Sequence, residues 1–168
     1  MVTNDIDGDD LQELVVRKVR LSFPRVIRAL LSGNVSLQLN FFRMTPDGGY
    51  AEEPNYEART NVHFSVSSGQ IDVPAIEVAD FDGDGLKDLV MQTRSDRLTL
   101  SHGVANENLF ADDSTRIEVD LPRNGGLVVS EDVDNDGRAD LIMRYTAADG
   151  EEAAHIVRLL IASPPSLL

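Results

Sequence analysis

The chain has 168 residues, 42% of them hydrophobic, which is enough for one globular unit with a core and too few for two large domains. Its 29 acidic and 15 basic residues give a formal net charge of -14, which disfavours nucleic acids and anionic membrane surfaces as partners because like charges repel. The absence of cysteine excludes a disulfide framework and a thiolate zinc site.

The first ten residues, MVTNDIDGDD, contain no basic region followed by an apolar stretch. No segment approaches the roughly 18 apolar residues of a membrane span. We therefore expect a soluble chain with no membrane insertion and no export signal of its own.

The first predicted element is an acidic loop, DIDGDDLQELVV, which begins at Asp5. The same pattern returns without a gap as DFDGDGLKDLVM from Asp80 and as DVDNDGRADLIM from Asp132. Each copy alternates Asp with other residues, places an acid at its ninth position and ends on apolar residues. Because β-favouring runs flank the loops, at 75–79, 89–91, 127–129 and 141–143, each loop is predicted to join two strands.

A short amphipathic helix is predicted over 22–33, with Ser22 as its cap and Gly33 as its stop. We expect it to pack on the protein's own surface; the alternative is a docking element that projects from the neighbouring strands. Its apolar residues recur at helical spacing: Phe23, Val26, Ile27, Leu30 and Leu31.

The remaining elements are short strands with one buried face each, because apolar residues alternate with polar ones. Gly-rich and Pro-rich turns at 46–49, 67–69 and 124–126 separate them, and a long connection is expected from Thr45 to Asn61. The alternating stretches lie at 35–39, 62–66, 98–100 and 117–121. Together these features predict an antiparallel meander.

The acidic loops are predicted calcium sites, because a hard divalent cation prefers six to eight oxygen ligands from carboxylates and backbone carbonyls. Up to three ions are expected. In the second loop the predicted ligands are Asp80, Asp82, Asp84, the carbonyl of Leu86, and Asp88. In the third they are Asp132, Asp134, Asp136, the carbonyl of Arg138, and Asp140. In the first they are Asp5, Asp7, Asp9, the carbonyl of Leu11, and Glu13.

The first loop differs from the other two, because Asp10 replaces the glycine of the sixth position and tolerates left-handed geometry less well. An EF-hand is the obvious competing motif, but it needs Glu at position 12 and two flanking helices. Position 12 is Val16, Met91 and Met143 in the three loops, and strand-like sequence flanks them. The EF-hand is therefore rejected for all three.

The three segments, above all DFDGDGLKDLVM, resemble the calcium loop of FG-GAP and VCBS repeats, which build integrin-like β-propellers. The resemblance covers most of the chain, loosely outside the loops. The Phe-Gly and Gly-Ala-Pro signatures of FG-GAP repeats are absent, so a VCBS-type repeat is the closer description. By position, the resemblance implies metal ligands at Asp80, Asp82, Asp84 and Asp88 and at their equivalents.

The resemblance implies an all-β fold of about three four-stranded antiparallel β-propeller blades with one inserted helix. Blade one is predicted over 1–74, with the helix near 22–33, blade two over 75–122, and blade three, incomplete, over 123–168. Because a propeller closes with about 4–8 blades, we expect the chain to be part of a larger propeller.

The predicted function is a calcium-binding interaction scaffold that recognises a protein or a carbohydrate, secreted, periplasmic or at the cell surface. No catalytic motif is recognisable, and His63, His102 and His155 lack paired spacing, so they are read as ordinary strand and turn residues and the chain as no enzyme. The alternative is a fragment of a propeller-fold enzyme whose catalytic residues lie outside this chain.

Overall fold

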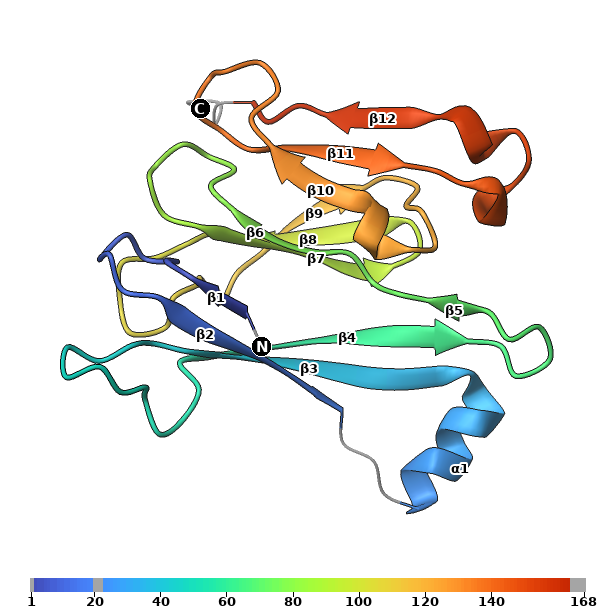
Figure 1. Cartoon of the computed structure of the whole chain (residues 1–168), viewed down its shortest axis with the longest axis horizontal. Coiled ribbons are helices and arrows are strands. Elements are labelled where there is room, and N and C mark those ends of the chain that lie inside the picture. The colour runs from blue at the N-terminus through green and yellow to red at the C-terminus, as the bar shows by residue number, and fades with distance from the viewer. Residues whose placement is uncertain (1, 20–22, 164–168) are drawn as a thin grey trace.

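Three antiparallel β-sheets stacked face to face form the architecture of the chain in a computed structural model (Figure 1). The structure describes residues 2–19 and 23–163, and these contain the three sheets and one short α-helix. The sheets follow one another both along the chain and along the stack, from the bottom to the top of Figure 1. This arrangement confirms the predicted mostly-β fold class.

The first sheet has five strands in sequential order, one more than the four predicted. Its β4 already begins at Tyr56, so the long connection predicted to reach Asn61 is shorter than expected. The strands are β1 (Val2–Asn4), β2 (Glu13–Val19), β3 (Asn34–Phe42), β4 (Tyr56–Phe64) and β5 (Ile71–Asp72).

The second sheet has the predicted four strands, again in sequential order. The third has three strands within the described residues, and 3-10 turns at Gly125–Leu127, Ala147–Asp149 and Ala153–His155 flank them. The strands of the second sheet are β6 (Ile76–Ala79), β7 (Asp88–Arg94), β8 (Arg97–Ser101) and β9 (Thr115–Glu118). Those of the third are β10 (Val128–Glu131), β11 (Asp140–Arg144) and β12 (Val157–Leu160).

Strand β7 lies at the centre of the stack and is buried on both faces. Successive side chains of a strand point to opposite faces of its sheet. Leu89 and Met91 accordingly pack into the core shared with the first sheet, whereas Val90 packs into the core shared with the third. This explains why the apolar run after the second loop does not alternate with polar residues.

The junction between the second and third sheets is tightly packed at Gly125. Its amide donates to the carbonyl of Val73 (2.7 Å). A Cβ at this position would overlap the backbone of Pro74 and Ala75, so only glycine fits without a shift of the chain.

The helix α1 (Phe23–Ser32) follows the predicted bounds closely, while its predicted cap, Ser22, lies outside the described residues. Gly33 ends it with a left-handed φ of 66° and donates its amide to the carbonyl of Ala29. The expected packing of its apolar face is wrong, because Leu30 and Leu31 are 56% and 85% exposed. No helix of the described ranges has the length and apolar character required to cross a membrane.

Candidate metal sites in three acidic loops

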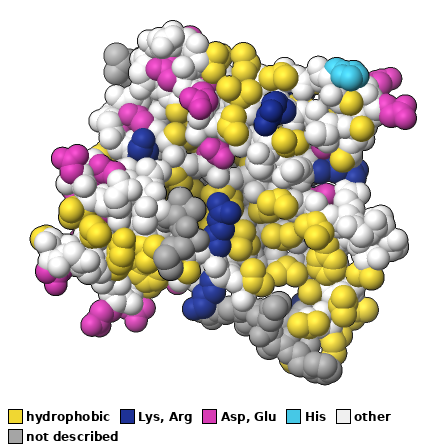
Figure 2. Space-filling view, in the orientation of Figure 1, with side chains coloured by type: hydrophobic (Ala, Val, Ile, Leu, Met, Phe, Trp, Pro, Cys, Tyr) yellow, Lys and Arg dark blue, Asp and Glu magenta, His cyan; other side chains and the backbone are white. Residues whose placement is uncertain are grey.

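Each acidic loop connects the first two strands of a sheet, as predicted, and all three lie along the left-hand edge of the stack in Figure 1. The strand register is the same in each hairpin: the residue before the first Asp pairs with the acid at the ninth position. Acidic side chains gather along this edge in the space-filling view (Figure 2). The register pairs are Asn4 with Glu13, Ala79 with Asp88, and Glu131 with Asp140.

The loops curl because their fourth and sixth residues adopt left-handed backbone geometry. In the second loop Gly83 and Gly85 have φ values of 81° and 91°, which glycine adopts without steric cost. In the third, Asn135 takes the fourth position at 59°. Asp10 adopts the same geometry at 67°, so the first loop keeps the shared curl despite lacking a glycine there.

The first Asp of each loop holds this curl by accepting two backbone hydrogen bonds. Asp80 accepts from the amides of Gly83 (2.7 Å) and Gly85 (2.9 Å). Asp5 accepts from the amides of the fourth and sixth residues in the same way, and Asp132 from those of the fifth and sixth. The curl is therefore encoded in the loop itself.

The alternating acids converge in the second and third loops, whereas in the first loop the cluster contains the ninth-position Glu13 and not the predicted ligand Asp9. One ligand atom from each member of a cluster lies within 4.8 Å of those of the other members. The clusters are Asp5, Asp7 and Glu13 in the first loop, Asp80, Asp82 and Asp84 in the second, and Asp132, Asp134 and Asp136 in the third. Sequence spacing alone predicted all of these residues as ligands.

The acid at the ninth position is fully buried in each loop, and in the second and third loops it connects the loop to the rest of its sheet. Asp88 accepts one hydrogen bond from the amide of Phe81 (2.9 Å) and another from that of Gly103 (2.7 Å), beyond β8. Asp140 accepts in the same way from Val133 and Ala162. Asp88 and Asp140 therefore brace their hairpins against the end of the third strand, a role that the sequence pattern did not reveal.

Burial makes a negative charge costly at three of the loop carboxylates, those of Asp7, Glu13 and Asp88. It raises the pKa of Asp88, although the amides of Gly103 and Phe81 act in the opposite direction. Burial also raises the pKa of Glu13 and that of Asp7, where the charge of Arg43 counteracts it. A cation in either loop would favour the ionised forms.

Neighbouring loops are in direct backbone contact. The amide of Lys87 in the second loop donates to the carbonyl of Ile6 in the first (2.8 Å), and the amide of Ala139 in the third donates to the carbonyl of Asp80 in the second (2.7 Å). The three clusters therefore form a row, in which each loop helps to position the next.

Arg43 is a site residue that the sequence pattern did not indicate. It follows β3, 34 residues after Asp9, and its guanidinium forms ion pairs with Asp7 and with Asp9 (3.4 Å). A cation from outside the loop thus reaches the first acidic cluster. In the third loop, Arg138 pairs with the neighbouring Asp136.

The assignment of His102 to an ordinary turn is incomplete. Its Nδ1 lies 2.9 Å from Asp82 Oδ2 and 3.5 Å from Asp88 Oδ1, so it joins the acids of the second loop. His102 comes directly after β8, 14 residues beyond Asp88, and no motif spacing links it to the loop.

The donor atoms fit a hard divalent cation, which prefers oxygen ligands. All converged atoms are carboxylate oxygens in the first cluster, in the third cluster, and in the cluster of Asp80, Asp82 and Asp84. The carbonyls of Leu11, Leu86 and Arg138 stay predicted ligands. Asp88 and Asp140 also stay predicted ligands, although their oxygens already accept backbone hydrogen bonds.

In a comparison with protein families, residues 80–143 match the model of the FG-GAP-like repeat. The matched segment starts at the first Asp of the second loop and ends in β11, after the third loop. The predicted resemblance is confirmed over this segment, and such repeats form propeller blades. No curated protein matches the chain.

Proposed function

Given that residues 80–143 are an FG-GAP-like repeat, we propose that the chain is a calcium-binding β-propeller module that serves as an interaction scaffold. The observation that carries this proposal is the recurrence of one loop geometry with converged carboxylates at the same edge of three stacked sheets. A single acidic turn would be unremarkable, whereas three equivalent ones in a row support a shared ligand.

The physical basis is charge. In each loop three acidic side chains place carboxylate oxygens within 4.8 Å of one another, and their mutual repulsion opposes the curl. A bound calcium ion would supply the positive charge that offsets this repulsion. Because the loop residues come together only in the folded hairpin, binding is coupled to folding.

The proposed scaffold continues beyond the third sheet. Val90 of the second sheet is 1% exposed because the third sheet covers it, and Ile142 holds the equivalent position in the third. Ile142 pairs with Val129 on one side and with Leu159 on the other, so a row of apolar residues crosses the outer face of the third sheet. Leu159 in this row is 48% exposed. A further blade of the same kind is the proposed occupant of this face.

The proposed location is outside the cell or in the periplasm. Calcium sites of extracellular modules bind at about 10⁻⁴–10⁻³ M, a concentration that these spaces supply. The partner proposed for the scaffold is a protein or a carbohydrate.

Calorimetric titration of calcium into chelator-treated protein tests the calcium proposal. We expect saturable heat with two or three ions per chain and a much weaker response to magnesium, which prefers a smaller octahedral shell. Asp82→Asn and Asp134→Asn should each remove one ion, whereas the exposed Asp112→Asn, outside the loops, should remove none. Absence of calcium-dependent heat in the parent protein would overturn the proposal.

A further inference from the structure

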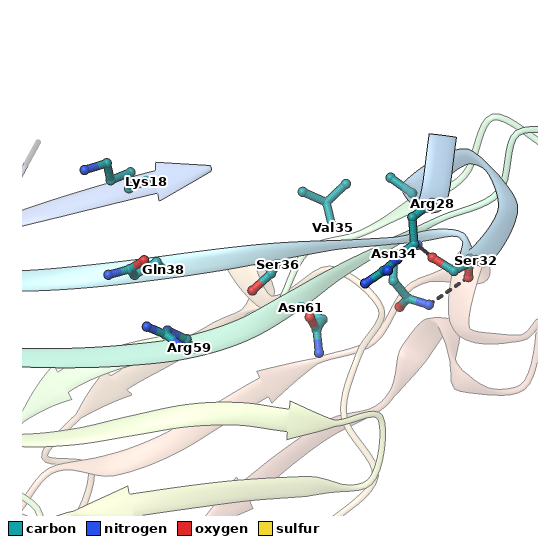
Figure 3. A pocket seen from close by; sticks show the side chains of 10 residues that line it. Lys18, Arg28, Ser32, Asn34, Val35, Ser36, Gln38, Arg59 and Asn61 are labelled. Atoms are coloured by element: carbon teal, nitrogen blue, oxygen red, sulfur yellow. Dashed lines mark hydrogen bonds between the residues drawn. The ribbon is translucent and has the colours of Figure 1, made fainter. Parts of the chain in front are cut away.

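A pocket lined mainly by polar and charged residues lies between α1 and the first sheet (Figure 3). These residues are distant in sequence from the second and third acidic loops. Its volume is about 400 Å³, within the range of small-ligand sites. Side chains from four elements meet there: α1, β2, β3 and β4.

The floor of the pocket is a row of three side chains across neighbouring strands. Lys18 of β2 pairs with Gln38 of β3, which pairs with Arg59 of β4. Because adjacent strands lie roughly 4.8 Å apart, two cations flank the buried amide of Gln38. This amide donates to Asn40 (2.9 Å), which fixes its orientation.

Arg28 of α1 brings a third cation to the other end of the pocket, beside Asn34 (Figure 3). The helix is held there by the turn that follows it, in which the Asn34 side-chain amide donates to the carbonyl of Ser32 (2.7 Å). Both of these residues also line the pocket. The third cation therefore comes from a structured junction and not from a free loop end.

This concentration of positive charge stands out in a chain of net charge -14. Among the described residues, Arg59 pairs with the exposed Glu57 at 3.4 Å, and no ion pair involves Lys18 or Arg28. No acidic side chain lines the pocket within the described ranges. The pocket is thus a local positive site suited to an anion.

The face that carries the pocket differs from the faces that pack between sheets. Leu39 and Ala58 point into the core toward the second sheet, so the alternating neighbours Gln38 and Arg59 point to the opposite, outer face. Hydroxyl and amide groups from Ser36 and Asn61 extend this polar surface. A face of this kind suits a hydrated ligand better than the apolar surface of a further blade.

We propose that the pocket binds a short saccharide carrying an oxyanion, as a sulfate or a uronic carboxylate. Lys18 and Arg59, which flank Gln38 on neighbouring strands, would hold the oxyanion, since guanidinium groups match carboxylate and sulfate geometry. Arg28 would contact the other end of the saccharide (Figure 3). The amides and hydroxyls offer the donors and acceptors that sugar hydroxyls require. This inference rests on the interaction role given under Proposed function and makes no use of the calcium ligands.

The test is calorimetric titration of the calcium-loaded protein with three probes: a sulfated heparin-type disaccharide, digalacturonic acid and sodium sulfate. We expect at least one of the two sugars to bind and its affinity to fall as salt screens the cations. Arg28→Gln combined with Arg59→Gln should weaken that binding at least tenfold. The matched control is Arg116→Gln, an exposed arginine of β9 outside the pocket, and it should bind as the parent does.

Three results would overturn the proposal: no binding of either sugar, equal binding by the double variant, or sulfate alone binding as tightly as the sugars. Binding of sulfate as tight as that of the sugars would mean that the pocket recognises the anion and not the saccharide. Calcium titration of the same proteins keeps the two ideas separate. If calcium binds and the sugars do not, the pocket proposal alone fails; if sugars bind and calcium does not, the calcium proposal fails.

Discussion

Arg43 reaches from the end of β3 into the first acidic loop and forms an ion pair with Asp7, whose side chain is fully buried. The second loop has no arginine or lysine of this kind within the described residues, and the cation of the third, Arg138, belongs to the loop itself. The first loop therefore has a positive charge tethered where an ion would otherwise offset its carboxylates. It should bind calcium more weakly than the second.

Replacing Arg43 by Gln should strengthen calcium binding at the first loop, because it frees Asp7 and Asp9 from the guanidinium. Without calcium the variant should be less stable by roughly 1–3 kcal/mol, the cost of leaving a buried acceptor without its partner. Chemical denaturation and calcium titration measure the two effects. Arg116→Gln is the control, and an unchanged calcium stoichiometry and affinity in Arg43→Gln would show that the guanidinium does not compete.

Asp84 and Asp88 should respond differently to removal of their charge. Each carboxylate oxygen of Asp88 accepts one buried backbone hydrogen bond, and Asp88→Asn replaces one of these oxygens by an NH₂ donor. The variant should therefore be less stable by roughly 1–3 kcal/mol even without calcium. Asp84 is exposed, so Asp84→Asn should leave calcium-free stability within about 0.5 kcal/mol and weaken calcium binding. Urea unfolding with and without calcium separates the two roles. Equal calcium-free stabilities of the two variants would contradict the bracing role of Asp88.

Gly125→Ala should disturb the junction between the second and third sheets, because the new Cβ would overlap the backbone of Pro74 and Ala75. The expected loss is roughly 3 kcal/mol, at the upper end for overpacking. Gly126→Ala is the matched control, since its Cβ would meet only the Asn124 side chain, at 3.2 Å. Thermal unfolding should show a large decrease in Tm for the first variant and a small one for the second, and similar Tm values would argue against the tight junction.

Glu77 should make the stability of the metal-free protein depend on pH. Burial raises its pKa above the ordinary value of 4.5. The hydrogen bond that the Ser130 hydroxyl donates to Glu77 (2.9 Å) lowers the pKa, but by less than burial raises it. Folding therefore favours the protonated form of Glu77. The stability that protonated Glu77 contributes is fully present below pH 4.5 and is lost as the pH rises through the folded-state pKa. Glu77→Gln, which keeps an acceptor for Ser130, should become progressively more stable than the parent over that rise.

Urea unfolding from pH 4 to pH 7 measures this difference, and Glu107→Gln, an exposed acid outside the loops, is its control. The control should show no trend with pH relative to the parent. A constant difference between Glu77→Gln and the parent would mean that Glu77 titrates alike in the folded and unfolded states.

The loops were predictable from sequence because their geometry is local. Asp80 accepts from amides three and five residues later, and the left-handed positions fall on Gly83 and Gly85, so twelve consecutive residues determine the curl. The helix was predictable for the same reason, from apolar spacing and the stop at Gly33.

The contributions of Arg43 and His102 were not predictable, because each reaches its loop through strand pairing rather than through sequence spacing. The bracing of Asp88 likewise depends on Gly103, which β8 brings to the loop. The exposure of Leu31 also escaped prediction, since helical periodicity identifies an apolar face but not what covers it.

The most direct test of the account is thermal unfolding of the parent protein in excess chelator and in increasing calcium. If the ions stabilise the folded hairpins, Tm should rise steadily with calcium, since each site adds about 2.7 kcal/mol at a hundred times its dissociation constant. Asp82→Asn combined with Asp134→Asn should lose most of this rise. A parent Tm that is the same in chelator and in calcium would contradict the claim that calcium holds these loops together.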